Sequence, residues 1–199
     1  MDVTGLSIAA GGAVVLGASV VGARYPSINP LEARVFRAIN GWPDWLYLPL
    51  WLPMQLGNLA VGTAAGLAIA WALGSAEVAV AVILAMLLKL VVERVVRREL
   101  TAYLDVRQRP GTSEPGAKLR GADVPDHGPS FPSGHVILVA AIATVLTGHL
   151  DNGVVLIPFV LAGLVAVGRV FVGAHNPLDV TAGMGAGLLV GGLLTAVLS

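Results

Sequence analysis

Six apolar segments, each about as long as a membrane-spanning helix, occupy most of this chain. A helix needs roughly 20 mostly apolar residues to cross the hydrocarbon core of a bilayer. The segments are approximately Thr4–Ala23, Met54–Leu73, Ala76–Val96, Gly134–His149, Gly153–Phe171 and Pro177–Leu198. This pattern predicts an all-α fold, an integral membrane six-helix bundle.

The composition agrees with a membrane protein and excludes several kinds of chemistry. Of the 199 residues, 56% are hydrophobic and 12% are charged, about half the charged share of a soluble domain. The absence of cysteine excludes disulfides, thiol nucleophiles and Cys-ligated zinc. A net charge of zero gives no indication of a nucleic-acid partner. We expect a single membrane-embedded domain, residues 1–199, that crosses the cell membrane several times among membrane lipids; the oligomeric state stays open.

The connection 24–45 is predicted to contain a short helix in the headgroup region. Asn29 is a suitable helix cap and Pro30 suits a first helical position. Three apolar residues then fall on one face, namely Leu31, Val35 and Ile39. The aromatic residues that follow are typical of an interfacial belt, namely Trp42, Trp45, Tyr47 and Trp51.

The segment of about 97–133 is the one extended hydrophilic stretch of the sequence. It is too polar to enter the bilayer, so we expect a long ordered polar loop over a site. All 12 Lys and Arg residues lie on, or next to, the membrane side that carries this loop. The positive-inside rule would make that side cytoplasmic, unless these cations serve to bind an anion.

Glycines at spacings of four predict close helix packing. They are Gly183, Gly187 and Gly191 in the last segment and Gly62 and Gly66 in the second. Such spacing lets two backbones approach each other. We expect these glycines to pack helices within the bundle rather than to form a dimer interface.

Three polar residues near the last two apolar segments form the first candidate site. Arg169 lies near the end of an apolar segment, where an unpaired guanidinium is costly, so it should face a partner, a cavity or an anion. If Pro177 begins the last helix, Asp179 lies in its first turn, close to His175. The carboxylate would then orient the imidazole as a nucleophile or base. The alternative is a purely structural ion-pair cluster between helices.

A second candidate site lies where the polar loop meets an apolar helix, at Pro132-Ser133-Gly134-His135. A Pro-Ser-Gly turn at a helix N-terminus exposes backbone amides, the positive end of the helix dipole and a hydroxyl. These groups favour an anion. The side chain of His135 would stand over them, on the same membrane face as Arg169 and His175.

Together the two motifs resemble those of the type 2 phosphatidic acid phosphatases, also called lipid phosphate phosphatases, which share their site with vanadium haloperoxidases. Pro-Ser-Gly-His at 132–135 matches one family motif, and Arg169, His175 and Asp179 match another in spacing. The six-helix plan also matches, so the resemblance covers nearly the whole chain.

The resemblance implies a membrane phosphatase that removes a terminal phosphate from a lipid mono- or diphosphate of the polyprenyl or glycerolipid type. His175 would form a phosphohistidine while Asp179 holds its tautomer, and His135 would protonate the leaving group. The substrate's phosphoryl oxygens would be bound by Arg169, the Ser133 hydroxyl and the amides near Gly134. This mechanism requires no metal and no other cofactor.

The family's first motif, a Lys followed after six residues by Arg-Pro, is not intact. Judged by its distance from the second motif, it best matches Glu93 and Leu100-Thr101, which lack both cations. Arg109-Pro110 follows Ala102, where a Lys is usual. Arg97 and Arg109 are therefore predicted to replace the missing substrate-binding cations.

These departures leave other functions open. Gly168 also stands where the family usually has Ser before the arginine of the third motif. The same residues would serve a lipid phosphotransferase. Loss of the usual cations could instead leave a catalytically weak membrane protein that binds lipid phosphates. A channel or transporter is disfavoured because the sequence lacks paired broken helices in corresponding halves.

Overall fold

The computed structural model describes residues 3–24, 28–103, 107–151 and 153–198, with only the backbone described for Arg97 and for residues 100–103. The α-helices are α1 (Val3–Gly22), α2 (Pro30–Asn40), α3 (Tyr47–Met54), α4 (Leu59–Ala72), α5 (Ala76–Tyr103), α6 (Pro110–Ser113), α7 (Gly134–Leu146), α8 (Ile157–Phe171) and α9 (Pro177–Leu198). Three short 3-10 turns are η1 (Asp44–Leu46), η2 (Gln55–Gly57) and η3 (Thr147–His149). Within these ranges no strand occurs, which confirms the all-α prediction.

The membrane character of the chain is carried by several apolar helices. By length and composition, α1 and α9 can each cross a membrane, and the bent pair formed by Asp44–Gly57 and Leu59–Ala72 qualifies when taken as one span. The stretches Gly134–His149 and Ile157–Phe171 are shorter apolar helices. Helix α5 is longer but carries Lys89 at its middle and further charged residues, such as Glu93, in its second half.

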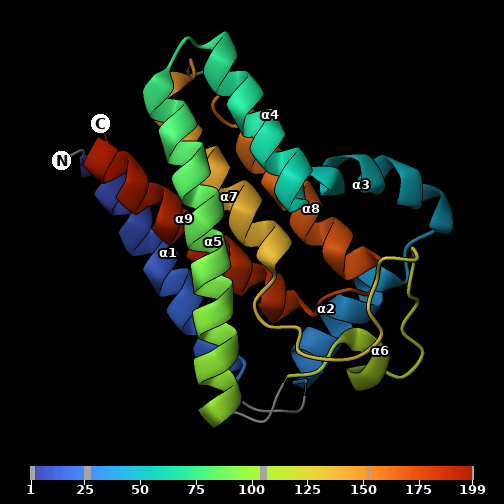
Figure 1. The fold of residues 1–199 in the computed structure, drawn as a ribbon. Helices are drawn as coiled ribbons and strands as arrows, with labels where there is room; N and C mark the ends of the chain where they lie inside the picture. The colour runs from blue at the N-terminus through green and yellow to red at the C-terminus, as the bar shows by residue number, and fades with distance from the viewer. Residues whose placement is uncertain (1–2, 25–27, 104–106, 152, 199) are drawn as a thin grey trace.

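Helix α9 packs on two neighbours through two different glycine faces. On one face, Gly183, Gly187 and Gly191 leave so little room that an added Cβ would lie within 2.7 Å of α7 or of Ser133 at its start. On the other, Gly185 and Gly192 approach the α1 backbone equally closely. Figure 1 shows α1 and α9 side by side, with both chain ends together. These glycines therefore pack helices within the chain, as expected.

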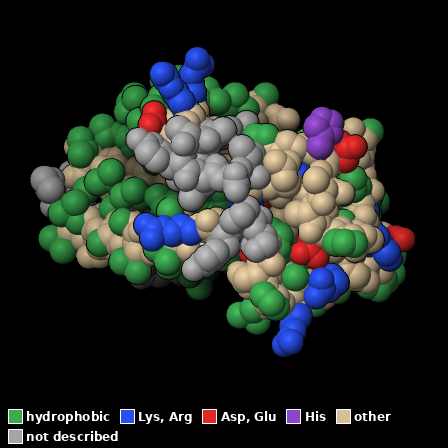
Figure 2. Space-filling model, turned by 90° about the horizontal axis from the view of Figure 1, so that it is seen from below, with side chains coloured by type: hydrophobic (Ala, Val, Ile, Leu, Met, Phe, Trp, Pro, Cys, Tyr) green, Lys and Arg blue, Asp and Glu red, His purple; other side chains and the backbone are tan. Residues whose placement is uncertain are grey.

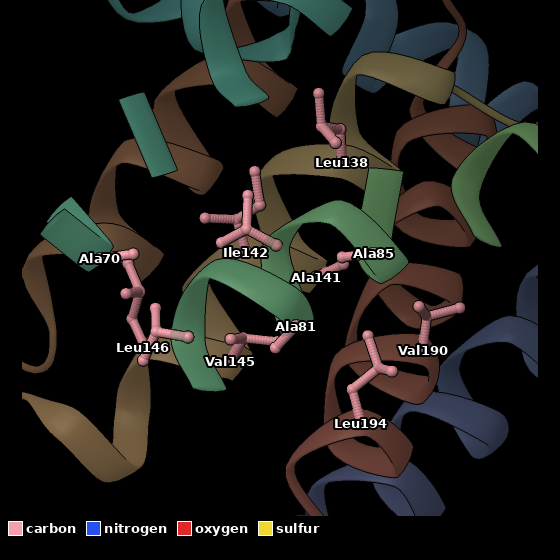
Figure 3. Packing of buried hydrophobic residues seen from close by; sticks show 12 residues of the cluster. Ala70, Ala81, Ala85, Leu138, Ala141, Ile142, Val145, Leu146, Val190 and Leu194 are labelled. Carbon is pink, nitrogen blue, oxygen red and sulfur yellow. The ribbon is translucent and has the colours of Figure 1, made fainter. Parts of the chain in front are cut away.

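A hydrophobic cluster joins four of the long helices (Figure 3). Ala70 of α4, Ala81 and Ala85 of α5, and Leu138 and Ile142 of α7 lie in it. The remaining side chains of the cluster include Val145 and Leu146 of α7 and Val190 and Leu194 of α9. Small residues on α4 and α5 let the larger α7 side chains fill the space between helices, as interior packing requires.

The second apolar segment differs from the single helix of 54–73 that we predicted. The chain is helical from Tyr47, passes through η2 and bends by 75° before α4 begins at Leu59. Asn58 causes the break because its backbone is extended and its side chain caps α4 by accepting hydrogen bonds from the amides of Ala60 and Val61. Pro53 lies in the last turn of α3.

The polar segment is also shorter than predicted, because α5 continues to Tyr103 beyond the expected end near Val96. From Arg107 onward the segment contains α6 and lies at one end of the molecule. Figure 1 shows α2, α6, the C-terminal end of α8 and the start of α9 gathered at this end, opposite the α4–α5 turn. Figure 2, which views the molecule from below, shows charged side chains exposed there among hydrophobic ones.

Candidate active site

The turn between α8 and α9 fixes His175 relative to Arg169. The carbonyl of Arg169 accepts hydrogen bonds from the amides of Ala174 (3.0 Å) and His175 (3.2 Å). Gly173 permits this closed turn because its φ of 78° is in the left-handed region, and an added Cβ would lie 2.6 Å from the Lys118 carbonyl. The six-residue spacing between Arg169 and His175 therefore corresponds to the last turn of α8 and the tight turn that follows it.

The start of α9 places the Asp179 carboxylate beside His175. The amide of Asn176 donates to Asp179 Oδ2 (2.8 Å), which is the carboxylate half of a capping box, and the amide of Asp179 donates to the backbone carbonyl of Asn176 (3.0 Å). His175 Nδ1 lies 3.7 Å from the same Oδ2. Burial lowers the pKa of the His175 imidazole, and Asp179 offsets only part of that effect.

The start of α7 is tied to the same place. The amide of Ser133 donates to the carbonyl of Asp179 (2.9 Å), while the buried Ser133 hydroxyl has no hydrogen-bond partner among the described residues and does not cap α7. His135, one residue inside the helix, packs its ring against Gly57, where an added Cβ would lie 2.7 Å away. At Gly134 an added Cβ would lie 2.8 Å from both carboxylate oxygens of Glu93.

Two arginines approach this region from different elements. Arg169 is buried at the end of α8; its Nη1 lies 4.0 Å from Asp123 Oδ2, and its Nε has no hydrogen-bond partner within the described ranges. Arg109, in the polar segment, donates through Nη1 to the carbonyl of Ala174 (2.8 Å). The positive charges of Arg169, Arg109 and a protonated His175 are close enough to His135 to interact with its imidazole electrostatically. A charge on any one of these four groups therefore influences the others.

A small polar cavity of about 40 Å³ opens beside His135 and Arg169. Its other lining residues come from the α3–α4 bend and the polar segment, namely Tyr47, Trp51, Met54, Gln55, Asn58, Arg120, Asp123, Val124 and Val172. Tyr47 and Trp51 thus border the cavity instead of serving only as an interfacial belt. Sequence reasoning did not assign the wall residues near the α3–α4 bend, such as Gln55 and Asn58, because their placement depends on the bend.

Arg107 is buried at the site and was not chosen from the sequence. Its Nε donates to Asp179 Oδ1 (2.8 Å) and its guanidinium also pairs with Glu32 of α2. Burial alone would lower the pKa of Arg107, but Asp179 and Glu32 raise it overall, so the group stays charged. One sequence feature could have indicated Arg107. It stands two residues before Arg109-Pro110, the one Arg-Pro pair in the sequence.

Two further expectations concern the motif departures. The side chain of Arg97 lies outside the described residues, so its predicted role stays a prediction. At Gly168, an added Cβ would lie 2.6 Å from Met54 Cγ. The side chain of Met54 therefore fills the space that a serine at position 168 would need.

Comparisons with known proteins agree with the resemblance of the motifs. A family model described as the PAP2 superfamily matches residues 74–199. Among solved structures, LpxE from Aquifex aeolicus is similar, with 26% sequence identity, a TM-score of 0.68 and coverage of 85% of this chain and 95% of that chain. A transmembrane PAP2-type phosphatidylglycerolphosphate phosphatase from Bacillus subtilis has 21% identity, a TM-score of 0.63 and coverage of 98% and 96%, a likeness in fold alone. No curated protein sequence matches the chain.

Proposed function

Because this chain belongs to the PAP2 superfamily, we propose that it hydrolyses the terminal phosphate of a lipid mono- or diphosphate in a membrane, through a phosphohistidine at His175. The observation that carries this proposal is geometric: His135 of α7 and Arg169 of α8 line one polar cavity, and the amide of His175, in the α8–α9 turn, donates a hydrogen bond to the carbonyl of Arg169. Two imidazoles and a guanidinium are the groups that acid–base and nucleophilic chemistry at a phosphate requires.

In the first step, His175 attacks the phosphorus. Its Nδ1 faces Asp179, so Nε2 is the nitrogen left for attack. The new N–P bond forms as the bond between phosphorus and the lipid oxygen breaks. Asp179 holds the tautomer and stabilises the imidazolium that develops. The 3.7 Å separation shortens when the imidazole gains charge, as catalytic hydrogen bonds often do.

His135 acts in both steps, the formation of the phosphohistidine and its hydrolysis. It first donates a proton to the departing lipid oxygen, which leaves as an alcohol or, from a diphosphate, as a lipid monophosphate. It then accepts a proton from the water that attacks phosphorus, so the N–P bond breaks and inorganic phosphate leaves. The position of His135 on the wall of the polar cavity supports this role.

The oxygens of the phosphoryl group would bind to buried donors at the start of α7 and the end of α8. Ser133 Oγ and Arg169 Nε are buried donors without a hydrogen-bond partner within the described ranges, and such groups cost about 1–3 kcal/mol each when left unpaired. A phosphate accepts from both. Arg109 and the amides at the start of α7, near Gly134, add positive potential.

An apolar groove supports a lipid substrate. It has a volume of about 280 Å³, lies between α4, α7 and α8, and is lined by residues such as Leu56, Gly66, Ile142 and Leu161. Leu56 precedes Gly57, against which His135 packs. A hydrocarbon chain in this groove would place its phosphate near the polar cavity. We propose that polyprenyl phosphates, polyprenyl diphosphates and phosphatidic-acid-like glycerolipids are the substrate classes.

Phosphate release from the purified protein in detergent tests the proposal. The panel contains phosphatidic acid, phosphatidylglycerol phosphate, a polyprenyl monophosphate and a polyprenyl diphosphate. We expect release from at least one lipid, and a loss of at least about 10³-fold in His175→Ala, because removal of a nucleophile leaves only binding and electrostatic effects. His127→Ala is the matched control, since His127 is an exposed histidine of the polar segment and has no assigned role at the site.

Equal background release from the wild type and His175→Ala on every lipid would contradict the proposal. If wild-type protein then still bound these lipids, the chain would be a lipid-phosphate-binding protein. Transfer of the phosphoryl group to an added lipid or sugar alcohol, in place of water, would identify a phosphotransferase that uses the same residues.

A further inference from the structure

Helix α2 turns a buried carboxylate toward the candidate active site. Its apolar Leu31 is 70% exposed, whereas Glu32 is 4% exposed and faces the protein. Asn29 caps the helix by accepting a hydrogen bond from the Glu32 amide (2.9 Å), which fixes this residue in the first turn. A buried acid is costly unless it is paired, so the partners of Glu32 indicate its role.

Glu32 has two partners, and both connect it to the Asp179–His175 pair. Its Oε1 accepts a hydrogen bond from the amide of Leu178 (2.8 Å), the residue before Asp179, and pairs with the guanidinium of Arg107. Arg107 in turn donates to Asp179 Oδ1. Glu32, Arg107 and Asp179 are each at least 94% buried, so this contact is poorly screened by water.

The polar segment holds Arg107 in this bridging position. The carbonyl of Arg107 accepts hydrogen bonds from the amide (3.0 Å) and the hydroxyl (3.1 Å) of Ser130, two residues before Pro132. The arginine therefore connects α2, the polar segment and α9 at the point where the nucleophile is oriented.

We propose that Glu32 and Arg107 are positioning residues that set the orientation and the charge of the Asp179–His175 pair, so that α2 is part of the catalytic support. This inference rests on the proposed phosphatase function. Arg107 shares its positive charge between two carboxylates. Glu32 thereby limits how far Arg107 neutralises Asp179, and it preserves the ability of Asp179 to stabilise the His175 imidazolium.

The sharing of charge predicts a signed change in pH dependence. Three charged groups act on His175, namely Asp179 from α9, Arg169 from α8 and Arg109 from the polar segment, and His175 in turn acts on His135 of α7. When Glu32 becomes neutral, Arg107 acts on Asp179 alone. Asp179 then stabilises the imidazolium less, so the acid limb of kcat/KM moves to lower pH and kcat falls.

The decisive variant is Glu32→Gln, measured on the best lipid of the substrate panel. It keeps an acceptor for the Leu178 amide and removes only the charge. We expect kcat to fall about tenfold, the size of a coupling within one ion-pair network, with an acid limb at lower pH and little change in KM. Glu32→Asp keeps the charge at a shorter reach. Its acid limb should stay at the wild-type pH even if its melting temperature falls as far as that of Glu32→Gln.

Glu114→Gln is the matched control. Glu114 is equally buried and also pairs with an arginine, Arg37 (3.2 Å), but this pair does not contact Asp179. Its pH profile should be that of the wild type. The position of an acid limb does not depend on the amount of folded enzyme, so partial unfolding cannot imitate the expected shift.

An unchanged acid limb and kcat in Glu32→Gln, or the same shift in Glu32→Gln and Glu32→Asp, would overturn the inference while the phosphatase function stands. If the wild-type protein released no phosphate from any lipid, the proposed function would fail first, and with it the basis of this inference. The two failures are therefore distinguishable.

Discussion

His175 shows how single residues at this site are tuned by their surroundings. It is 97% buried, with Asp179 on one side and cations from two other elements nearby. Burial penalises the imidazolium, and the charges of Arg169 and Arg109 act in the same direction. The environment thus keeps the imidazole neutral and able to attack phosphorus.

This environment predicts an acid limb at unusually low pH. The reactive form of His175 is the neutral one, and burial lowers its pKa below the ordinary 6.5. Activity should therefore persist below pH 6.5 and decline only as the folded-state pKa is passed. Measurement of kcat/KM between pH 4 and 8 checks this, with tightly buffered detergent conditions. A limb at or above 6.5 would contradict the assigned environment.

The residues of the site could be predicted from sequence only where local spacing decides their geometry. Arg169, His175 and Asp179 are within one turn and one helix start, so their spacing already implied their proximity. Glu32 and Arg107 escaped prediction because their partners are distant in sequence. A glutamate on an amphipathic helix ordinarily faces solvent or headgroups, and only the packing of α2 on α9 shows otherwise.

At the scale of helices, the contact between α3 and α8 determines the shape of the polar cavity. Met54, at the end of α3, packs on Gly168 of α8 and also lines the cavity. The bend at Asn58 brings Gln55 and Asn58 to the same wall. Hydrophobicity predicted an apolar segment here but not its bend, because the side-chain cap of Asn58 acts locally within a continuous apolar run.

A serine at position 168, usual in the family that the motifs resemble, should therefore be unfavourable in this chain. Its Cβ would lie 2.6 Å from Met54 Cγ, and overpacking of this kind costs about 1–3 kcal/mol. We expect Gly168→Ser to lower the melting temperature and the activity, and Met54→Ala/Gly168→Ser to recover the lost stability. Thermal melts in detergent with phosphate-release assays check both. An unchanged melting temperature of Gly168→Ser alone would contradict this prediction, because it would show that the Met54 side chain moves aside at no cost.

At the scale of the whole molecule, small residues determine how the helices pack, and charged residues form the candidate site. Glycines on two faces of α9 let it lie against α1 and α7 at once, and this close packing fixes where the helix starts. Helices α7 and α9 begin and α8 ends at the same end of the molecule (Figure 1), and the charged groups of the site, namely Arg107, Arg169 and Asp179, belong to this end. Six apolar segments could be recognised from hydrophobicity alone, whereas their mutual arrangement depends on these backbone contacts.

The central claim is that groups from separate helices act on one phosphoryl group bound to His175. Trapping of the phosphorylated enzyme tests it most directly. A polyprenyl diphosphate labelled in its terminal phosphate is added to the His135→Ala variant. The first step can still occur, because the lipid monophosphate that leaves needs little protonation. The second step is slow, because the variant lacks the base that activates water. After an alkaline quench, which preserves a bond between nitrogen and phosphorus, peptide mapping locates the label. The account predicts label on His175 and none in His175→Ala; label on another residue, or undiminished turnover in His175→Ala, would contradict it.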